Sequence, residues 1–246
     1  MKIDLILIHG WAMNSAVWQP CVQRLPDGVT SQCIDLPGYG KSLEVNAGGL
    51  DDYVEQVAQQ ISGPAVLVGW SLGGLVSLRL AQRFPEKVSA LVQVASSPKF
   101  VQAIDWPTAI EPGVFEQFAA SLQKDVMKTI RRFLALQVRS TDTSATTVRA
   151  LQHTIDQRGL PTNEALLTGL KILSETDLRQ TLRSLHCPVT WILGEKDMLV
   201  PVTLAGALDD MLSAPDVHIV QGAGHAPFIS HPEAFVAELL RAAGRS

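Results

Sequence analysis

A serine flanked by glycines provides the clearest chemical signal in the sequence. The segment Gly69–Gly73 reads GWSLG, directly follows the apolar run Ala65–Val68, and opens a segment with helical spacing. A serine on such a sharp strand-to-helix turn needs glycine two residues before and after it, because the neighbouring backbone passes very close. The N–H of Leu72 and the start of the helix would face a developing oxyanion. We therefore predict that Ser71 is a nucleophile; the alternative is a Gly-rich turn with an incidental serine.

A nucleophilic serine needs a base, and the base needs an acid that fixes its tautomer. The sequence WILGEKD places Asp197 just after a buried apolar run, and QGAGHAPF places His225 after the next one. Because both positions follow strands, we predict Asp197 as the orienting acid and His225 as the general base. Glu195 is the competing acid, and Asp177 is less favoured because it precedes its strand.

The first apolar run ends in His9-Gly10-Trp11. A tight turn there would bend the backbone toward the serine, so the N–H of Trp11 is the candidate second oxyanion donor. The remaining histidines have ordinary explanations in packing, surface or helix-start positions: His153, His186, His218 and His231.

Short β-rich apolar runs alternate with helical segments, which indicates an α/β fold with a mostly parallel sheet flanked by helices. We expect strands at 4–8, 31–34, 65–68, 90–94, 189–193 and 217–220, and helices at 50–61, 72–84 and about 232–242. About 90 residues between the fourth and fifth of these strands show almost no strand pattern, far more than a crossover needs. We therefore predict a core made of residues 1–98 and 178–246 and an inserted helical lid at 99–177.

Composition excludes several classes of protein. With 246 residues, 46% hydrophobic and 18% charged, the chain is too apolar for disorder. The net charge of -4 gives no basic field for nucleic acid, and no apolar run is long enough to cross a membrane. The 3 cysteines lie far apart without a CxxC pair, and the N-terminus lacks a signal-peptide pattern. We expect a cytoplasmic protein with reduced thiols and no metal or organic cofactor.

Several motifs together carry a family resemblance. They are HGW (9–11), DLPGYGKS (35–42), GWSLGG (69–74), VASSP (94–98), FLALQ (133–137), GEKDMLVP (194–201) and HAPFISHP (225–232). The sequence resembles the α/β-hydrolase superfamily, which has the chain order Ser, Asp, His. More closely, it resembles the pimeloyl-[acyl-carrier protein] methyl ester esterases of biotin synthesis. HGW and GWSLGG alone indicate only the superfamily.

The resemblance implies a function and a set of roles. It implies hydrolysis of the methyl ester of pimeloyl-[acyl-carrier protein] by Ser71, Asp197 and His225, with Trp11 and Leu72 as backbone donors that also contact substrate. It also implies that one segment forms a wall of the acyl site: Phe133, Leu134, Ala135, Leu136 and Gln137. Family members usually carry one or two strands' worth of sequence before HGW, so we expect a shortened sheet edge here.

The segment from Lys124 to Gln137 has an apolar stripe and a basic opposite side. Taken by itself, the basic side is explained as a helix face exposed to solvent. For a lid over an acyl site, the basic side suits the acidic acyl carrier protein that the resemblance implies as partner, because exposed cations raise the association rate. We expect Lys128, Arg132 and Arg149 to help dock it.

Other functions remain open. A general short-chain carboxylesterase or a carbon–carbon bond hydrolase would use the same residues, whereas enzymes of this fold with an aspartate nucleophile would not use Ser71. A non-enzymatic ligand receptor is a further alternative, against which the complete Ser, Asp and His set argues. We expect a monomer.

Overall fold

The computed structural model describes residues 3–138 and 141–244 and contains one parallel sheet of 6 strands in the order β2-β1-β3-β4-β5-β6. Every neighbouring pair of these strands is parallel. The strands are β1 (Ile3–Ile8), β2 (Val29–Ile34), β3 (Ala65–Trp70), β4 (Val88–Val94), β5 (Val189–Gly194) and β6 (Asp216–Val220). Because all the strands run the same way, the loops that carry the predicted chemical groups leave from one edge of the sheet.

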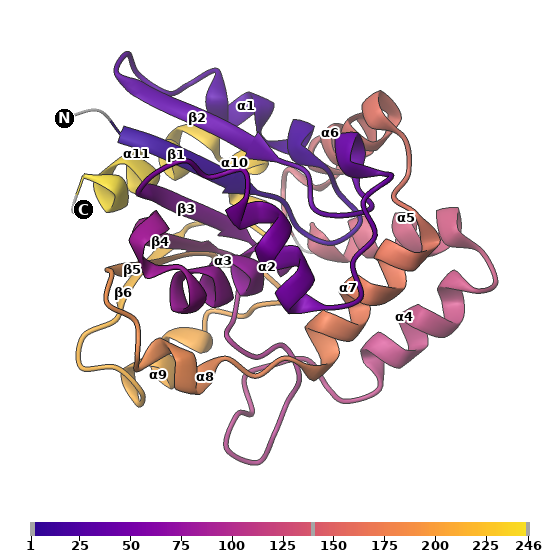
Figure 1. Ribbon diagram of the computed structural model, residues 1–246. Helices are drawn as coiled ribbons and strands as arrows, with labels where there is room; N and C mark the ends of the chain where they lie inside the picture. Colours follow the sequence, from indigo (N-terminus) through magenta and orange to yellow (C-terminus); the bar gives the residue numbers. More distant parts are fainter. Residues whose placement is uncertain (1–2, 139–140, 245–246) are drawn as a thin grey trace.

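Helices cover both faces of the sheet (Figure 1). One face packs against α2 (Leu50–Ala58) and α3 (Leu72–Arg83), and the other against α1 (Gln19–Val22), α10 (Pro227–Ser230) and α11 (Pro232–Ala243). The short helices are α8 (Arg179–Leu182), α9 (Leu204–Asp209) and the 3-10 turns η1 (Ser15–Trp18), η2 (Gly40–Ser42) and η3 (Pro85–Lys87). Burial on both faces explains why the central strands read as continuous apolar runs. Among the described residues, no helix is long and apolar enough to span a bilayer.

The long segment between β4 and β5 carries four substantial helices beyond the carboxyl ends of the strands (Figure 1). These are α4 (Val114–Leu122), α5 (Val126–Gln137), α6 (Ser144–Arg158) and α7 (Asn163–Glu175). Its two connections to the core lie side by side, because Lys99 forms an antiparallel bridge with Asp177 and the Leu178 N–H donates to the Pro98 carbonyl at 2.8 Å. We call residues 99–177 the helical insertion.

The elements expected from sequence are all present, with small differences at their ends. The helix expected over 50–61 ends at Ala58, because Ile61 turns back and buries its side chain in the core. The Lys87 ammonium holds that turn by donating to the Ile61 carbonyl at 2.6 Å. The short helices α1, α9 and α10 were not expected, since four to six residues are too few to show a periodic apolar pattern.

A buried ion pair ties the helical insertion to the core. The Asp35 carboxylate, whose side chain is only 3% exposed, accepts from the Arg158 guanidinium of α6 at 2.9 Å. It also accepts from the backbone N–H of Ser15 at 2.6 Å and of Lys41 at 3.0 Å. Burial alone would raise the pKa of Asp35, but the nearby His9 and the N–H donors of Ser15 and Lys41 leave the pKa below its ordinary value.

We expect Arg158→Ala to lower the free energy of unfolding by about 3 kcal/mol, because it leaves a buried carboxylate without its cation. Urea unfolding at neutral pH measures this. Arg24→Ala is the matched control, since Arg24 pairs with the exposed Glu233 and should change stability little. Equal effects of the two substitutions would contradict the importance of the buried pair.

The same carboxylate predicts a pH dependence. Because the pKa of Asp35 is lowered on folding, its contribution to stability is complete above the ordinary carboxyl pKa of about 3.9 and is lost as the pH falls through the lowered folded-state pKa. The stability difference between wild type and Asp35→Asn, measured by urea unfolding at several pH values, should therefore shrink in acid. A difference that grows on acidification would contradict this assignment.

Candidate active site

Ser71 occupies the turn between β3 and α3 in a strained conformation, with φ 53° and ψ -116°. A positive φ is uncommon for a residue that carries a side chain. Glycines make the turn possible: a Cβ on Gly73 would lie 2.4 Å from the carbonyl oxygen of Ile8, and one on Gly69 would lie 2.4 Å from that of Gly73. The Ser71 N–H donates to the Val94 carbonyl at 3.0 Å. The predicted GxSxG turn is therefore present, held between β1 and β4.

His225 and Asp197 form a buried pair at the same edge of the sheet. Nδ1 of His225 lies 2.8 Å from Oδ2 of Asp197, and the two side chains are 1% and 0% exposed. Oδ1 of Asp197 accepts from the backbone N–H of Leu199 at 2.8 Å and of Val200 at 3.1 Å. An ionised carboxylate can only accept, so Nδ1 carries the proton and Nε2 is the basic nitrogen. Among the described residues, the buried Nε2 has no hydrogen-bond partner.

The loop that carries His225 is held from three sides. Nε1 of Trp70, the residue before the serine, donates to the His225 carbonyl at 2.7 Å, and the His225 N–H donates to the Gln137 carbonyl at 2.9 Å. A Cβ on Gly194 would lie 2.0 Å from the Gly224 carbonyl oxygen. The last turn of α5 therefore fixes the backbone of the histidine. No residue pattern predicts this contact, because any residue type can supply a backbone carbonyl.

The turn after β1 lies against the serine. A Cβ on Gly10 would lie 3.2 Å from Cβ of Ser71. Neither the N–H of Trp11 nor that of Leu72 donates a hydrogen bond to another described residue, so neither N–H is taken up by an acceptor within the described structure. The imidazole of His9 braces this turn: its Nε2 accepts from the Leu36 N–H at 3.0 Å, and its Nδ1 contacts the Gly10 carbonyl at 2.8 Å. Burial lowers the pKa of His9.

A small apolar cavity of about 20 Å³ opens beside Ser71. The other lining residues are all apolar: Phe100, Ile110, Val114, Phe115, Phe118, Phe133, Leu170, Leu173 and Leu199. A cavity needs roughly 10–15 Å³ to hold one water molecule, so this space is too small for an acyl chain. Substrate entry therefore requires some of these side chains to move apart.

Of the predicted acyl wall, Phe133 lines this cavity and the other four residues do not. Leu134 and Gln137 are buried, Leu136 is half-buried and Ala135 is exposed. Both amide atoms of the Gln137 side chain are buried without a partner among the described residues.

The aromatic residues noted in the sequence are buried near the serine, and the described basic residues lie on the surface. Trp11 lies beside the cavity, with its ring 4.7 Å from that of Phe133, whereas Trp70 packs against Phe228 behind the serine. The side chains expected to dock a carrier protein are exposed: Lys128, Arg132 and Arg149. Another basic residue of this region, Arg139, lies outside the described residues.

The competing candidates for the acid are engaged elsewhere. Glu195 is exposed and accepts from the Gly222 N–H at 2.8 Å, while Asp177 pairs with Lys99 at 3.1 Å and with Arg179 at 2.8 Å. Burial raises the pKa of all three cysteine thiols, to about 12 for Cys21 and about 11 for Cys33, which disfavours the nucleophilic thiolate.

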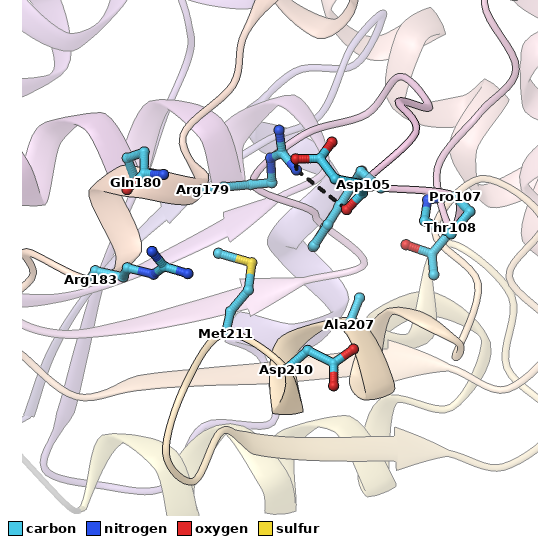
Figure 2. Close-up of a pocket in the computed structure, with 10 residues that line it drawn as sticks. Asp105, Pro107, Thr108, Arg179, Gln180, Arg183, Ala207, Asp210 and Met211 are labelled. Carbon is cyan, nitrogen blue, oxygen red and sulfur yellow. Dashed lines mark hydrogen bonds and ion pairs between the residues drawn. The ribbon is translucent and has the colours of Figure 1, made fainter.

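A wider cleft of about 330 Å³ lies between α8, α9 and the 105–108 loop (Figure 2). Arg179 spans its rim, pairing with Asp105 at 2.9 Å and lying over the ring of Trp106 at 5.4 Å. Ser71, Asp197 and His225 are not among the residues that line it. Its ion pairs brace the connections of the helical insertion.

The parallel sheet, the serine turn after β3 and the His225–Asp197 pair after β6 and β5 define an α/β hydrolase. The model of the alpha/beta hydrolase family matches residues 5–238. An esterase from Exiguobacterium antarcticum has the same fold, with a TM-score of 0.86 and 18% identity, covering 98% of this chain and 92% of that chain.

Two curated relatives are more similar in sequence, and each is called a pimeloyl-[acyl-carrier protein] methyl ester esterase. The one from Vibrio vulnificus (strain CMCP6) is 40% identical over 242 residues, which are 98% of this chain and 94% of the relative. The one from Stenotrophomonas maltophilia (strain K279a) is 44% identical over 237 residues, 96% of this chain and 91% of the relative. The chain belongs to the alpha/beta hydrolase family and, within it, to the family of these methyl ester esterases. It is a carboxylic ester hydrolase.

We expect Trp70→Phe to destabilise the protein more than Trp191→Phe. Both tryptophans are buried, but Nε1 of Trp70 donates to the His225 carbonyl, whereas Nε1 of Trp191 has no partner among the described residues. The difference should be about 1–3 kcal/mol, the cost of an unpaired buried carbonyl. Urea unfolding of the two variants measures it, and equal losses would show that the bond from Trp70 is unimportant.

Proposed function

We propose that this chain hydrolyses the methyl ester of pimeloyl-[acyl-carrier protein], releasing pimeloyl-[acyl-carrier protein] and methanol, with Ser71, His225 and Asp197 as its catalytic triad. The observation that carries the assignment of roles is the buried His225–Asp197 pair at 2.8 Å, at the sheet edge that also holds the strained serine. The choice of substrate rests on the similarity to the pimeloyl-[acyl-carrier protein] methyl ester esterases of Vibrio vulnificus and Stenotrophomonas maltophilia.

In the proposed reaction, Nε2 of His225 takes the proton of Ser71 as Oγ attacks the ester carbonyl. The backbone N–H groups of Trp11 and Leu72 stabilise the oxyanion, and Asp197 stabilises the imidazolium that forms. The proton then passes from His225 to the departing methoxide, and methanol leaves an acyl-enzyme. Water, deprotonated by the same histidine, adds to the acyl carbonyl and releases the acid with the serine restored.

We also propose that the helical insertion acts as a lid over the acyl site. The cavity beside Ser71 is lined by apolar side chains, which suits the methylene groups of a pimeloyl chain, but its volume of about 20 Å³ requires opening. Helix α4 is the candidate moving part. It supplies Val114, Phe115 and Phe118 to the cavity, and no hydrogen bond among the described residues joins it to another element.

An acyl carrier protein is the proposed partner, docking on the basic side of the insertion. Lys128, Arg132 and Arg149 are exposed, and the Arg132 guanidinium lies 5.7 Å from the ring centroid of Phe118. Because Phe118 lines the cavity, this basic surface adjoins the acyl site. A carrier docked there would present its acyl arm next to α4. We further propose that the enzyme works as a cytoplasmic monomer in biotin synthesis.

We expect purified protein to release methanol from pimeloyl-[acyl-carrier protein] methyl ester, and Ser71→Ala to lower kcat by a factor on the order of 10⁶. A fluorophosphonate probe should label wild type but not folded Ser71→Ala. Labelling that survives the substitution would refute the nucleophile.

Rescue of a biotin-requiring strain that lacks its own esterase tests the substrate. Wild type should restore growth and Ser71→Ala should not. Suppose that wild type reacts with the fluorophosphonate probe and hydrolyses small esters, but neither rescues growth nor acts on the carrier-bound ester. The enzyme would then be a general carboxylesterase.

Charge reversal tests the docking surface. Lys128→Glu, Arg132→Glu and Arg149→Glu should each raise KM for the carrier-bound ester by about threefold to tenfold, because each removes a cation and adds an anion at the contact. KM for dimethyl pimelate should stay unchanged. Arg183→Glu is the matched control, since this exposed arginine makes the same charge change beside the cleft of Figure 2. Equal loss on both esters would count against docking.

A further inference from the structure

The end of β4 holds both polar groups of the nucleophile's backbone. The Ser71 N–H donates to the Val94 carbonyl at 3.0 Å, and the Ser96 hydroxyl donates to the Ser71 carbonyl at 2.8 Å. Ala95, between them, has φ 42°, a left-handed value that residues with a side chain seldom adopt. Because the backbone bends at Ala95, both Val94 and Ser96 can form a hydrogen bond with Ser71. Ser96 is completely buried, so its hydroxyl is not a surface group that happens to touch the turn.

The Ser71 carbonyl belongs to the same peptide unit as the Leu72 N–H. A trans peptide is planar, so its C=O and N–H point in opposite directions. A donor that fixes the oxygen on one side therefore fixes the direction of the N–H on the other. The same oxygen also accepts from the Gly74 N–H at 2.9 Å. Two donors on one carbonyl polarise the peptide and make its N–H a stronger donor.

The chain makes room for this hydroxyl. A Cβ on Gly74 would lie 2.1 Å from Oγ of Ser96 and 2.5 Å from its Cβ. Only glycine can occupy this position of α3 while the serine keeps its place. The last glycine of GWSLGG, Gly74, is thereby explained by Ser96; the nucleophile turn itself does not require it.

We propose that Ser96 is a positioning residue for the oxyanion: through the Ser71–Leu72 peptide, its hydroxyl aims and strengthens the Leu72 N–H. This inference rests on the proposed roles of Ser71 and Leu72. Among the described residues, Ser96 forms no hydrogen bond with His225 or Asp197. It does not itself line the apolar cavity, and of the lining residues it is hydrogen-bonded to Ser71, through the backbone carbonyl. It should therefore act on the transition state and leave substrate binding unaffected.

Removal of the hydroxyl is compatible with folding. In Ser96→Ala the Ser71 carbonyl keeps its hydrogen bond from the Gly74 N–H, so no buried acceptor is left unpaired. Ser97→Ala is the matched control. Ser97 is the neighbouring serine, also buried, but its hydroxyl donates to the Lys99 carbonyl at 2.7 Å and not to the nucleophile.

The test compares wild type, Ser96→Ala and Ser97→Ala on a small methyl ester and with a trifluoromethyl ketone. Oγ of the nucleophile adds reversibly to the ketone carbonyl and its proton passes to the base, which leaves a tetrahedral oxyanion that mimics the transition state. For Ser96→Ala we expect kcat to fall about tenfold. This is less than the fall in kcat of about 10²–10³-fold that follows the removal of one complete oxyanion donor. KM should stay within about twofold, and the inhibition constant of the ketone should rise by the same factor as kcat falls.

The pH profile separates positioning from general damage. The acid limb of kcat/KM should be unchanged in Ser96→Ala, because the base and its carboxylate are untouched, and Ser97→Ala should match wild type throughout. If Ser96→Ala does not fold, Ser96→Cys takes its place, since a thiol is a weaker donor of similar shape and should give a smaller loss of the same kind.

Three outcomes overturn the inference: a kcat for Ser96→Ala equal to that of Ser97→Ala, a loss confined to KM, or a loss of kcat without weaker ketone binding. Failure of the proposed function has a different signature. In that case wild type itself would neither turn over the methyl ester nor bind the ketone.

Discussion

The left-handed backbone of Ser71 is the constraint on which the rest of the site depends. A residue with a side chain adopts φ 53° only when its surroundings enforce it. Val94, at the end of β4, accepts from the N–H of Ser71, and Ser96, two residues further on, donates to its carbonyl. Glycines let β1 and α3 approach the turn. The strain places Oγ at the sheet edge and leaves the next N–H unoccupied. If this turn relaxed, the Ser71 hydroxyl and the Leu72 N–H, the proposed oxyanion donor, would both leave their positions.

The helical insertion supports the candidate catalytic groups through hydrogen bonds, in addition to lying over the site. Its helix α5 ends on the carbonyl that accepts from the His225 N–H, and its helix α7 accepts from the Trp11 indole through the Leu166 carbonyl at 2.8 Å. Movements of the insertion are therefore coupled to the base and to the turn after β1. Helix α4 has no such bonds and contributes apolar side chains to the cavity, so it can move with the least effect on the proposed catalytic groups.

Sequence reasoning succeeded where local pattern and topology determine the result. Continuous apolar runs predicted the strands, and parallel strands imply that turns at 71, 197 and 225 share one edge. It did not reveal the contacts of Gln137, Trp70 and Ser96 with backbone atoms, because such contacts depend on packing between distant segments. The acyl wall shows the same limit: helical spacing marks an apolar stripe, but only the packed structure shows that Phe133 alone of that segment lines the cavity.

The central claim is that Ser71 carries the acyl group between two half-reactions. Mass spectrometry of protein quenched in acid during turnover of dimethyl pimelate tests it directly. The account predicts a methyl pimeloyl adduct on the peptide that contains Ser71, accumulating in wild type and absent from Ser71→Ala. An adduct on a different residue, with hydrolysis proceeding at the wild-type rate in Ser71→Ala, would contradict it.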